Sequence, residues 1–300
     1  MGASLRKTEN NLAESAGIDT WNDAEILAAF VGGQERAIAA VKAAIPQISK
    51  AANAIAACLA GGGHLIYAGA GTSIRIGVQD GSELPATFGM AEDKIDYLIA
   101  GGRAAMFETL ADAEDDAIEG SRAASACKAG DALIAIAASG STPYTIAAAK
   151  RARELGATVV AVVNNPNSAL AAAGDIEILL DSGPEVITGS TRMGAGTAQK
   201  AALNFLSTLV HIKLGAVYDG MMVNVQAGNL KLKARAGGIV SRIAGVSEKD
   251  AAAALELTRG EVKPAILISA GAASPDAAQQ LLLESKGNLR LALSRLAATR

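Results

Sequence analysis

Short apolar runs alternate with helical stretches through the middle of the chain. The runs lack the polar alternation of a half-buried strand, and segments with helical periodicity separate most of them. Strands with both faces buried have this pattern, because helices cover the two sides of a parallel sheet. The sequence therefore predicts an α/β fold, a doubly wound parallel sheet in three αβα layers. The predicted strands are 65–68, 95–100, 132–137, 158–163 and 176–180.

Helical patterns flank the predicted sheet. Between residues 38 and 59, apolar residues recur at steps of three and four, a narrow stripe suited to packing on another helix or a second subunit. Pro46 is expected to kink this helix or divide it. Residues 1 to about 20 are expected to form a loose arm. The predicted domains are an N-terminal arm with helices (1–44), a sheet domain (45–220), and a helical linker with a C-terminal helical module (221–300).

Composition and charge narrow the function. With a formal net charge of -3, the chain has no basic surplus for a phosphate backbone, which argues against nucleic-acid binding. No apolar run approaches the roughly 18 residues of a membrane helix, and the polar N-terminus has no signal-peptide core. Cys58 and Cys127 stand in unrelated contexts, which argues against a disulfide framework and against a zinc site. These features predict a soluble, cytoplasmic protein.

Two loops rich in glycine and hydroxyl residues follow predicted strands, at 69–73 and 138–143. Pro143 suits the first position of a helix, so Thr142 is the expected N-cap. Free N–H groups and the positive end of the helix dipole would then face the loop, an arrangement suited to phosphate. Ordinary tight turns are the alternative for each loop. The first loop lacks the third glycine of a dinucleotide fingerprint, and the sequence contains no Walker A motif.

Acid–base chemistry in this chain is expected to fall to carboxylates, because His64 and His211 stand in structural contexts. Glu83 comes shortly after the first loop, and Glu114 lies in an acidic run. Two carboxylates near an anion site can divide the acid and base roles if their environments differ. The alternatives are a helix-end residue for Glu83 and a solvated helix face for Glu114. A glycine- and hydroxyl-rich segment at 189–200 either approaches a ligand or is an ordinary connection.

These segments together resemble the N-acetylmuramic acid 6-phosphate etherases, a branch of the SIS-domain proteins. The resemblance runs from about Thr8 to the end of the chain. Its most specific stretch is Pro-Glu-Val-Ile-Thr-Gly-Ser-Thr-Arg-Met at 184–193, followed by Ala-Gly-Thr-Ala-Gln-Lys at 195–200. The resemblance implies a sheet of SIS type. The other matching stretches are 69–73, 82–83 with Pro85, 99–102, 113–115, 138–140 with 142–144, 222–223, and Asn229 with 231–232 and Arg235.

The resemblance also implies an activity. Such enzymes cleave the D-lactyl ether of N-acetylmuramic acid 6-phosphate by elimination and hydration, in cell-wall amino sugar recycling, without a metal or organic cofactor. Glu83 is implied as the acid that helps lactate leave and later activates water, and Glu114 as the base at C2. A homodimer with sites near the subunit interface is implied as well. The residues implied to hold the 6-phosphate are Thr72, Ser73, Ser139, Gly140 and Thr142, with Ser190 near the sugar.

The sequence departs from this family at Ile74, Ser141, Gly194 and Asn224, where Gly, Arg, Lys and Asp are usual. Ser141 and Gly194 each remove a positive charge near the expected anion site, which leaves ligand preference and turnover open at this stage. A SIS-type sugar-phosphate isomerase and a non-catalytic sugar-phosphate-binding regulator are the alternatives. The etherase-specific stretch argues against the isomerase. Retention of both glutamates favours an enzyme, whereas the loss of both basic side chains favours the regulator.

Overall fold

The computed structural model describes residues 7–108, 110–225 and 230–298. The chain divides into two compact units: the first contains Met1–Gly81 and Asp93–Thr208, and the second contains Ser82–Glu92 and Leu209–Arg300. The domain borders predicted after residues 44 and 220 stay predictions. The strands are β1 (Leu65–Gly69), β2 (Ile95–Ile99), β3 (Ala132–Ala137), β4 (Thr158–Val163), β5 (Ile176–Leu179), β6 (Val217–Tyr218) and β7 (Met221–Met222). The α-helices are α1 (Asp23–Ala43), α2 (Ile45–Ala60), α3 (Gly71–Phe88), α4 (Ala117–Ala123), α5 (Pro143–Glu154), α6 (Ala169–Ala173), α7 (Gly194–Lys213), α8 (Leu230–Ala244), α9 (Glu248–Leu257), α10 (Val262–Ser269), α11 (Pro275–Glu284) and α12 (Leu289–Ala298).

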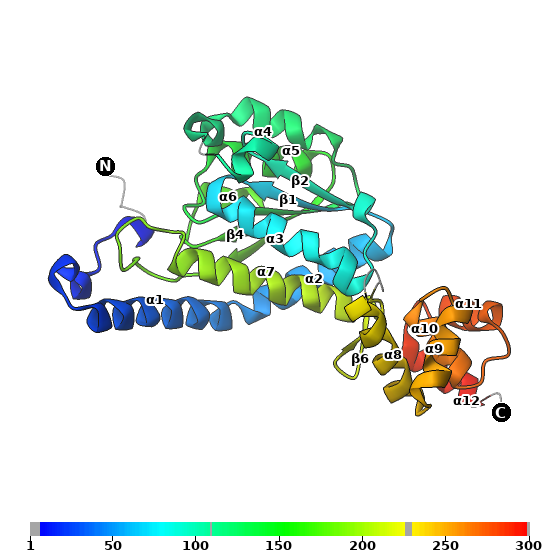
Figure 1. Cartoon of the computed structure of the whole chain (residues 1–300). Helices are drawn as coiled ribbons and strands as arrows, with labels where there is room; N and C mark the ends of the chain where they lie inside the picture. Colours follow the sequence, from blue (N-terminus) through cyan, green and yellow to red (C-terminus); the bar gives the residue numbers. More distant parts are fainter. Residues whose placement is uncertain (1–6, 109, 226–229, 299–300) are drawn as a thin grey trace. The chain divides into compact units, whose positions relative to one another are not determined.

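The first unit is built on a five-stranded parallel sheet with the strand order β2-β1-β3-β4-β5. All of the predicted strands are present, and the predicted α/β class is confirmed. Helices α4 and α5 cover one face of the sheet, and α3 and α7 lie on the other (Figure 1). Every residue of β3 is buried. Both faces of the central strands are covered, which explains why their sequences are unbroken apolar runs.

Alanine and glycine bring the helices close to the sheet. On one face Ala148, Ala149 and Ala152 of α5 are fully buried in a core with Leu133 of β3. On the other face, a Cβ at Gly77 would lie 2.9 Å from Ile136 Cδ1, so α3 lies closer than a side chain at this position permits. Close packing of this kind fixes where α3 and α5 begin, and therefore where the loops before them lie.

The N-terminal helical pattern divides where the sequence predicted. Pro46 lies in the first turn of α2, directly after the break from α1, which confirms the expected effect of proline. The predicted apolar stripe is divided as well. Ile48 and Ile55 of α2 are buried, whereas Ile38 and Ile45 are 48% and 55% exposed. Part of the stripe therefore serves the core of the first unit, and part of it faces outward.

The segment before α1 is more ordered than expected. Residues 7–20 form three 3-10 turns at Lys7–Glu9, Ala13–Ser15 and Ile18–Thr20, so the expectation of a loose arm is wrong for them. Residues 1–6 lie outside the described residues. Thr8 and Asn165 are both buried, and Asn165 Nδ2 donates a hydrogen bond to Thr8 Oγ1 at 3.0 Å. Short polar side chains make this contact, and hydropathy patterns do not report them.

The described part of the second unit consists of helices and the β6–β7 hairpin. Its core contains Val240 of α8 together with Ile266 and Leu267 of α10. The side chains of Ser247 and Ser274 cap α9 and α11 by accepting hydrogen bonds from backbone N–H groups of their first turns. Within the described ranges, no helix is long and apolar enough to cross a bilayer.

Candidate active site

The two predicted phosphate loops lie at the same edge of the sheet. β1 and β3 are parallel neighbours with Gly69 paired to Ile136, so the loops that follow them leave side by side. Helix α3 begins at Gly71, which places Thr72 and Ser73 in its first turn; Thr72 is half-buried and Ser73 is buried. The first N–H groups of a helix have no intrahelical acceptor, and the helix dipole adds positive potential there. The site therefore favours an anion.

The second loop is shaped by Gly140. Its φ is +66°, and a Cβ there would lie 2.3 Å from Ser168 Oγ, so glycine is required on both grounds. Thr142 is the N-cap residue of α5 as predicted, but its side chain makes no capping hydrogen bond, which leaves the hydroxyl available to a ligand. Ser139 Oγ accepts hydrogen bonds from Ser141 N at 3.2 Å and from Ser141 Oγ at 3.1 Å. The serine that replaces the usual arginine is thus turned back into the loop.

The segment that carries Glu114 is tied to the first loop. Glu114 is exposed in the 3-10 helix η6 (Ala111–Asp115), which follows β2, the other neighbour of β1. Arg75, in the first turns of α3, donates from Nη2 to Ala105 O at 2.8 Å and to Glu108 O at 3.2 Å. A Cβ at Gly101 would lie 3.1 Å from the Cβ of Ala113, beside Glu114. These contacts bring η6 to the same edge as the phosphate loops.

Glu83 is exposed on α3, in the part of this helix that belongs to the second unit. Thr72 lies eleven positions earlier on the same helix, in the part that belongs to the first unit. A Cβ at Gly196 of α7 would lie 3.6 Å from Ile76 Cδ1 and 3.7 Å from Thr72 Cγ2. The start of α7 therefore lies beside Thr72.

Ser190 lies half-buried in the connection between β5 and α7, which begins at Gly194. The buried carboxylate of Glu185 accepts hydrogen bonds from Gly194 N at 2.9 Å and from Ala195 N at 2.8 Å. The start of α7 thus already holds an anionic group, so the helix N-terminus itself is not a phosphate site. A Cβ at position 194 would lie 3.0 Å from Glu185 Oε2, which is tight for any larger residue.

Asp80 is a supporting residue that the sequence analysis missed. Its buried carboxylate accepts hydrogen bonds from Tyr67 Oη at 2.8 Å, Asn204 Nδ2 at 2.6 Å and Ser207 Oγ at 3.0 Å. Burial raises the pKa of Tyr67 well above its usual value, and the Asp80 carboxylate raises it further. Burial, with a smaller effect of Asp80, raises the pKa of Tyr97 to about 12. The network joins β1, α3 and α7 within the first unit.

The remaining chemically notable side chains have structural contacts. His64 Nδ1 lies 2.9 Å from Asp96 Oδ2, and the His211 ring stacks on Phe88 at a centroid distance of 4.5 Å. Both cysteines are free, and burial raises the pKa of the Cys127 thiol to about 11. In the ranges that the structure describes, no group of three or more His, Cys, Asp or Glu residues could hold a metal ion.

Comparison with known proteins gives consistent matches along the chain. Residues 106–210 match the SIS domain family, and residues 47–152 match the glucokinase regulatory protein N-terminal SIS domain. The chain is 48% identical to the N-acetylmuramic acid 6-phosphate etherase of Symbiobacterium thermophilum, over 87% of each chain. It is 44% identical to that of Deinococcus radiodurans, over 92% of each chain. With that of Serratia proteamaculans the identity is 42%, over 98% of this chain and 99% of the relative.

Proposed function

The chain belongs to the N-acetylmuramic acid 6-phosphate etherase family of SIS-domain enzymes, and from this membership we propose how its own residues carry out the reaction. The protein is a carbon–oxygen lyase that cleaves the lactyl ether of N-acetylmuramic acid 6-phosphate. The observation that carries this conclusion is the identity of 42–48% to etherases over 87–98% of the chain.

The loops after β1 and β3 hold the 6-phosphate. Hydroxyls of Thr72, Ser73, Ser139 and Thr142 donate hydrogen bonds to its oxygens, together with backbone N–H groups at the starts of α3 and α5. Gly140 lets the backbone approach the phosphate closely. The adjacency of the two loops and the uncommitted hydroxyl of Thr142 support this assignment. Ser190, on the connection that leads to α7, lies toward the sugar.

Elimination is the first chemical step. In the open-chain sugar, the aldehyde at C1 acidifies the proton on C2. The Glu114 carboxylate removes this proton, and the electron pair forms the C2–C3 double bond as the C3–O bond breaks. Glu83, acting as a carboxylic acid, gives its proton to the departing oxygen, so D-lactate leaves with a neutral hydroxyl group.

Hydration completes the reaction and restores both carboxyl groups. Water adds to C3 of the unsaturated aldehyde while the Glu83 carboxylate accepts a proton from that water. The protonated Glu114 returns its proton to C2, which gives N-acetylglucosamine 6-phosphate. Each glutamate thus acts once as an acid and once as a base, in opposite order, which requires the two carboxyl groups to lie in different environments.

The test measures lactate release and hydrogen exchange at C2 in the same samples, with N-acetylmuramic acid 6-phosphate in D₂O. Glu83→Gln should release lactate at least about 100-fold more slowly while C2 still exchanges, because the base remains. Glu114→Gln should lose both signals. Asp112→Asn is the matched control, since Asp112 is an exposed carboxylate on the same 3-10 helix and has no assigned role. Normal lactate release by Glu83→Gln would refute its role as the acid.

The wild-type result separates the assignment from the alternatives. Release of lactate with incorporation of solvent oxygen at C3 of the product is the expected outcome for elimination and hydration. Thermal stabilisation by the sugar phosphate without lactate release would instead indicate a regulator. Formation of a ketose phosphate would indicate an isomerase.

The active form is a homodimer in which the outer side of α1 contributes to the interface. Leu27, Val31 and Ile38 are 61%, 57% and 48% exposed, and their spacing of four and seven residues places them on one side of the helix. Exposed apolar stripes of this kind mark association surfaces. Val31→Glu should therefore lower the mass measured by light scattering to that of one chain. Ala39→Glu, exposed on another side of α1, should not change the mass.

A cytoplasmic location fits the state of the cysteines. Cys58 and Cys127 are both free, and the thiol of Cys127 is buried. Free thiols of this kind are typical of a reducing compartment. Fractionation of cells that produce the protein should recover lactate-releasing activity in the soluble cytoplasmic fraction, and activity confined to membranes would contradict this location.

A further inference from the structure

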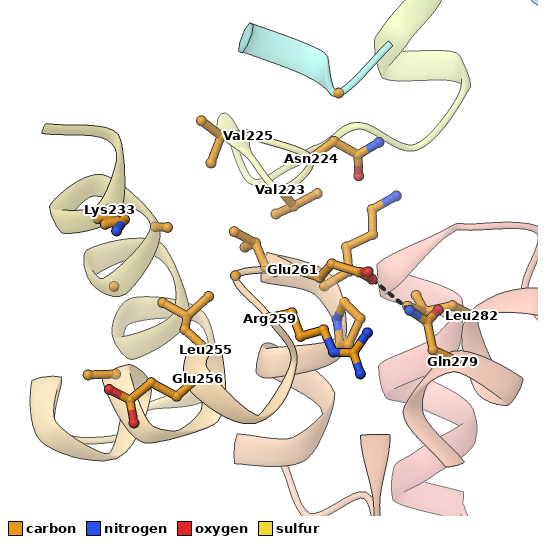
Figure 2. Close-up of a pocket in the computed structure, with 18 of the residues that line it drawn as sticks. Val223, Asn224, Val225, Lys233, Leu255, Glu256, Arg259, Glu261, Gln279 and Leu282 are labelled. Atoms are coloured by element: carbon orange, nitrogen blue, oxygen red, sulfur yellow. Dashed lines mark hydrogen bonds between the residues drawn. The ribbon is translucent and has the colours of Figure 1, made fainter. Parts of the chain in front are cut away.

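The second unit contains a hollow of about 1440 Å³ that the reaction described above does not use. It is lined by residues of α8, α9, α10 and α11 and of the segments that join them. In Figure 2, Leu255 of α9 and Leu282 of α11 lie on opposite walls, with Arg259 between them. None of the residues assigned to the etherase site lines this hollow. It combines apolar walls with polar groups, as ligand pockets do.

A buried cation lies in the wall. Lys263 is only 8% exposed, and its ammonium group donates one hydrogen bond, to Gly287 O at 2.7 Å. Among the described residues it forms no ion pair with a carboxylate. Burial lowers the pKa of Lys263 to about 8. An ammonium that is buried without a counter-charge destabilises the folded state, and a bound anion would relieve this cost.

Four basic and three acidic residues line the hollow, so basic side chains are in slight excess. Lys233, Arg259 and Lys286 also line the hollow. The three acidic residues of the lining are Glu261 and, on α9, Glu248 and Glu256. The Glu261 carboxylate accepts a hydrogen bond from Gln279 Nε2 at 2.6 Å. Figure 2 shows Glu256 at the far side of the hollow from the Glu261–Gln279 pair.

Asn224, which the sequence analysis marked as a departure from the family pattern, lines the same hollow. Its side chain is a neutral amide and adds no negative charge to the lining.

Two adjacent glycines on α8 expose bare helix backbone to the hollow. Gly237 and Gly238 lie in the interior of α8, where each glycine costs about 1 kcal/mol relative to alanine. Both line the hollow, and a Cβ at either position would meet no heavy atom of the described residues within 4 Å. Packing among the described residues therefore does not account for the pair. Close approach of a ligand to the backbone does account for it.

We propose that this hollow binds a small organic anion with an apolar, flat body. The anionic group pairs with the Lys263 ammonium, and Arg259 and Lys286 are further basic residues of the lining. The apolar body lies against the bare backbone of Gly237 and Gly238, between the walls that carry Leu255 and Leu282. The site is independent of the lactyl-ether chemistry and gives the C-terminal helical module a ligand of its own.

The probe is 8-anilinonaphthalene-1-sulfonate, whose sulfonate and fused aromatic rings match the two requirements. Titration of the full chain should show one saturable fluorescent site. Lys263→Met keeps the apolar stem and removes the charge, and it should weaken binding at least tenfold. Gly238→Leu fills the open space with a side chain that favours the helical conformation. It should weaken binding to a similar extent. Asn224→Asp adds one negative charge with almost no change in shape, and it should weaken binding several-fold.

Two controls keep the result interpretable. Lys249→Met removes an exposed lysine of α9 that does not line the hollow and should leave binding unchanged. Lactate release should be the same in Lys263→Met as in the wild type, so a failure of this proposal is distinct from a failure of the etherase assignment. The proposal is overturned if the wild type shows no saturable site, or if Lys263→Met and Gly238→Leu both bind the probe as tightly as the wild type.

Discussion

Replacing Lys263 by methionine measures how strongly the buried ammonium destabilises the folded chain. The side chain is 8% exposed, and burial lowers its pKa from 10.5 to about 8. The folded pKa thus lies below the unfolded value. Between pH 8 and 10.5 the unfolded chain binds more protons at this position than the folded chain does, so the free energy of unfolding rises with pH across that window. Below pH 8, the cost of burying the charge is fully present.

The size of the effect follows from the two pKa values. The folded and unfolded pKa values of Lys263 differ by about 2.5, which corresponds to a loss of about 3 kcal/mol in the free energy of unfolding at low pH. About 2 kcal/mol of this loss is recovered when the pH rises from 7 to 9.5. A methionine side chain does not titrate, so the Lys263→Met variant should lack this rise. The substitution also leaves Gly287 O without its donor, which costs about 1 kcal/mol at every pH. The pH dependence therefore isolates the charge, whereas stability at a single pH does not.

The assay is urea unfolding followed by circular dichroism at pH 7 and pH 9.5, in buffers free of organic anions. The free energy of unfolding of the wild type should rise by about 2 kcal/mol relative to Lys263→Met between these two values. Lys249→Met, which removes an exposed lysine of α9, should follow the wild type. A difference between wild type and Lys263→Met that stays constant with pH would refute the reasoning.

Four further substitutions test the site and its supports. Gly140→Ala should lower lactate release at least tenfold, roughly the effect of misplacing a binding group, because its Cβ would lie 2.3 Å from Ser168 Oγ. Asp80→Ala should lower the free energy of unfolding by about 3 kcal/mol in urea titrations, because the buried donors of Tyr67 and Ser207 and the partly buried amide of Asn204 lose their acceptor. Glu185→Ala should cost about 2 kcal/mol in the same measurement, since the start of α7 loses its cap. Gly237→Ala should raise stability by about 1 kcal/mol, because its Cβ enters open space.

The sequence was sufficient for features that depend on local pattern. The five strands were predictable because helices bury both of their faces, which leaves continuous apolar runs. The break before α2 and the N-cap position of Thr142 followed from proline, whose fixed φ and missing N–H act within a single turn. In both cases the determining interactions lie within a few residues of the position that they specify.

Features that depend on distant partners were not predictable. Asp80 lies on the apolar side of α3, yet its acceptor role is visible only once Asn204 of α7 is packed against it. The cap of α7 by Glu185 spans a loop whose conformation no local rule specifies. The hydrogen bond between Thr8 and Asn165 joins residues 157 positions apart in the sequence. Single polar side chains make these contacts, so they leave no periodic signal.

Helix α3 contains both features set by local sequence and features set by distant partners. Its first turn carries Thr72 and Ser73, its buried side carries Asp80, and Glu83 lies eleven positions after Thr72. A slip of α3 by one residue would turn Glu83 by about 100° and move it by about 1.5 Å. The first phosphate loop would hold the N-terminal end of α3 in place. A displacement of α3 would therefore be larger at Glu83 than at this end. Loss of the Asp80 anchor should therefore lower kcat for lactate release more than it raises KM, because phosphate binding depends on the end of α3 that the loop fixes.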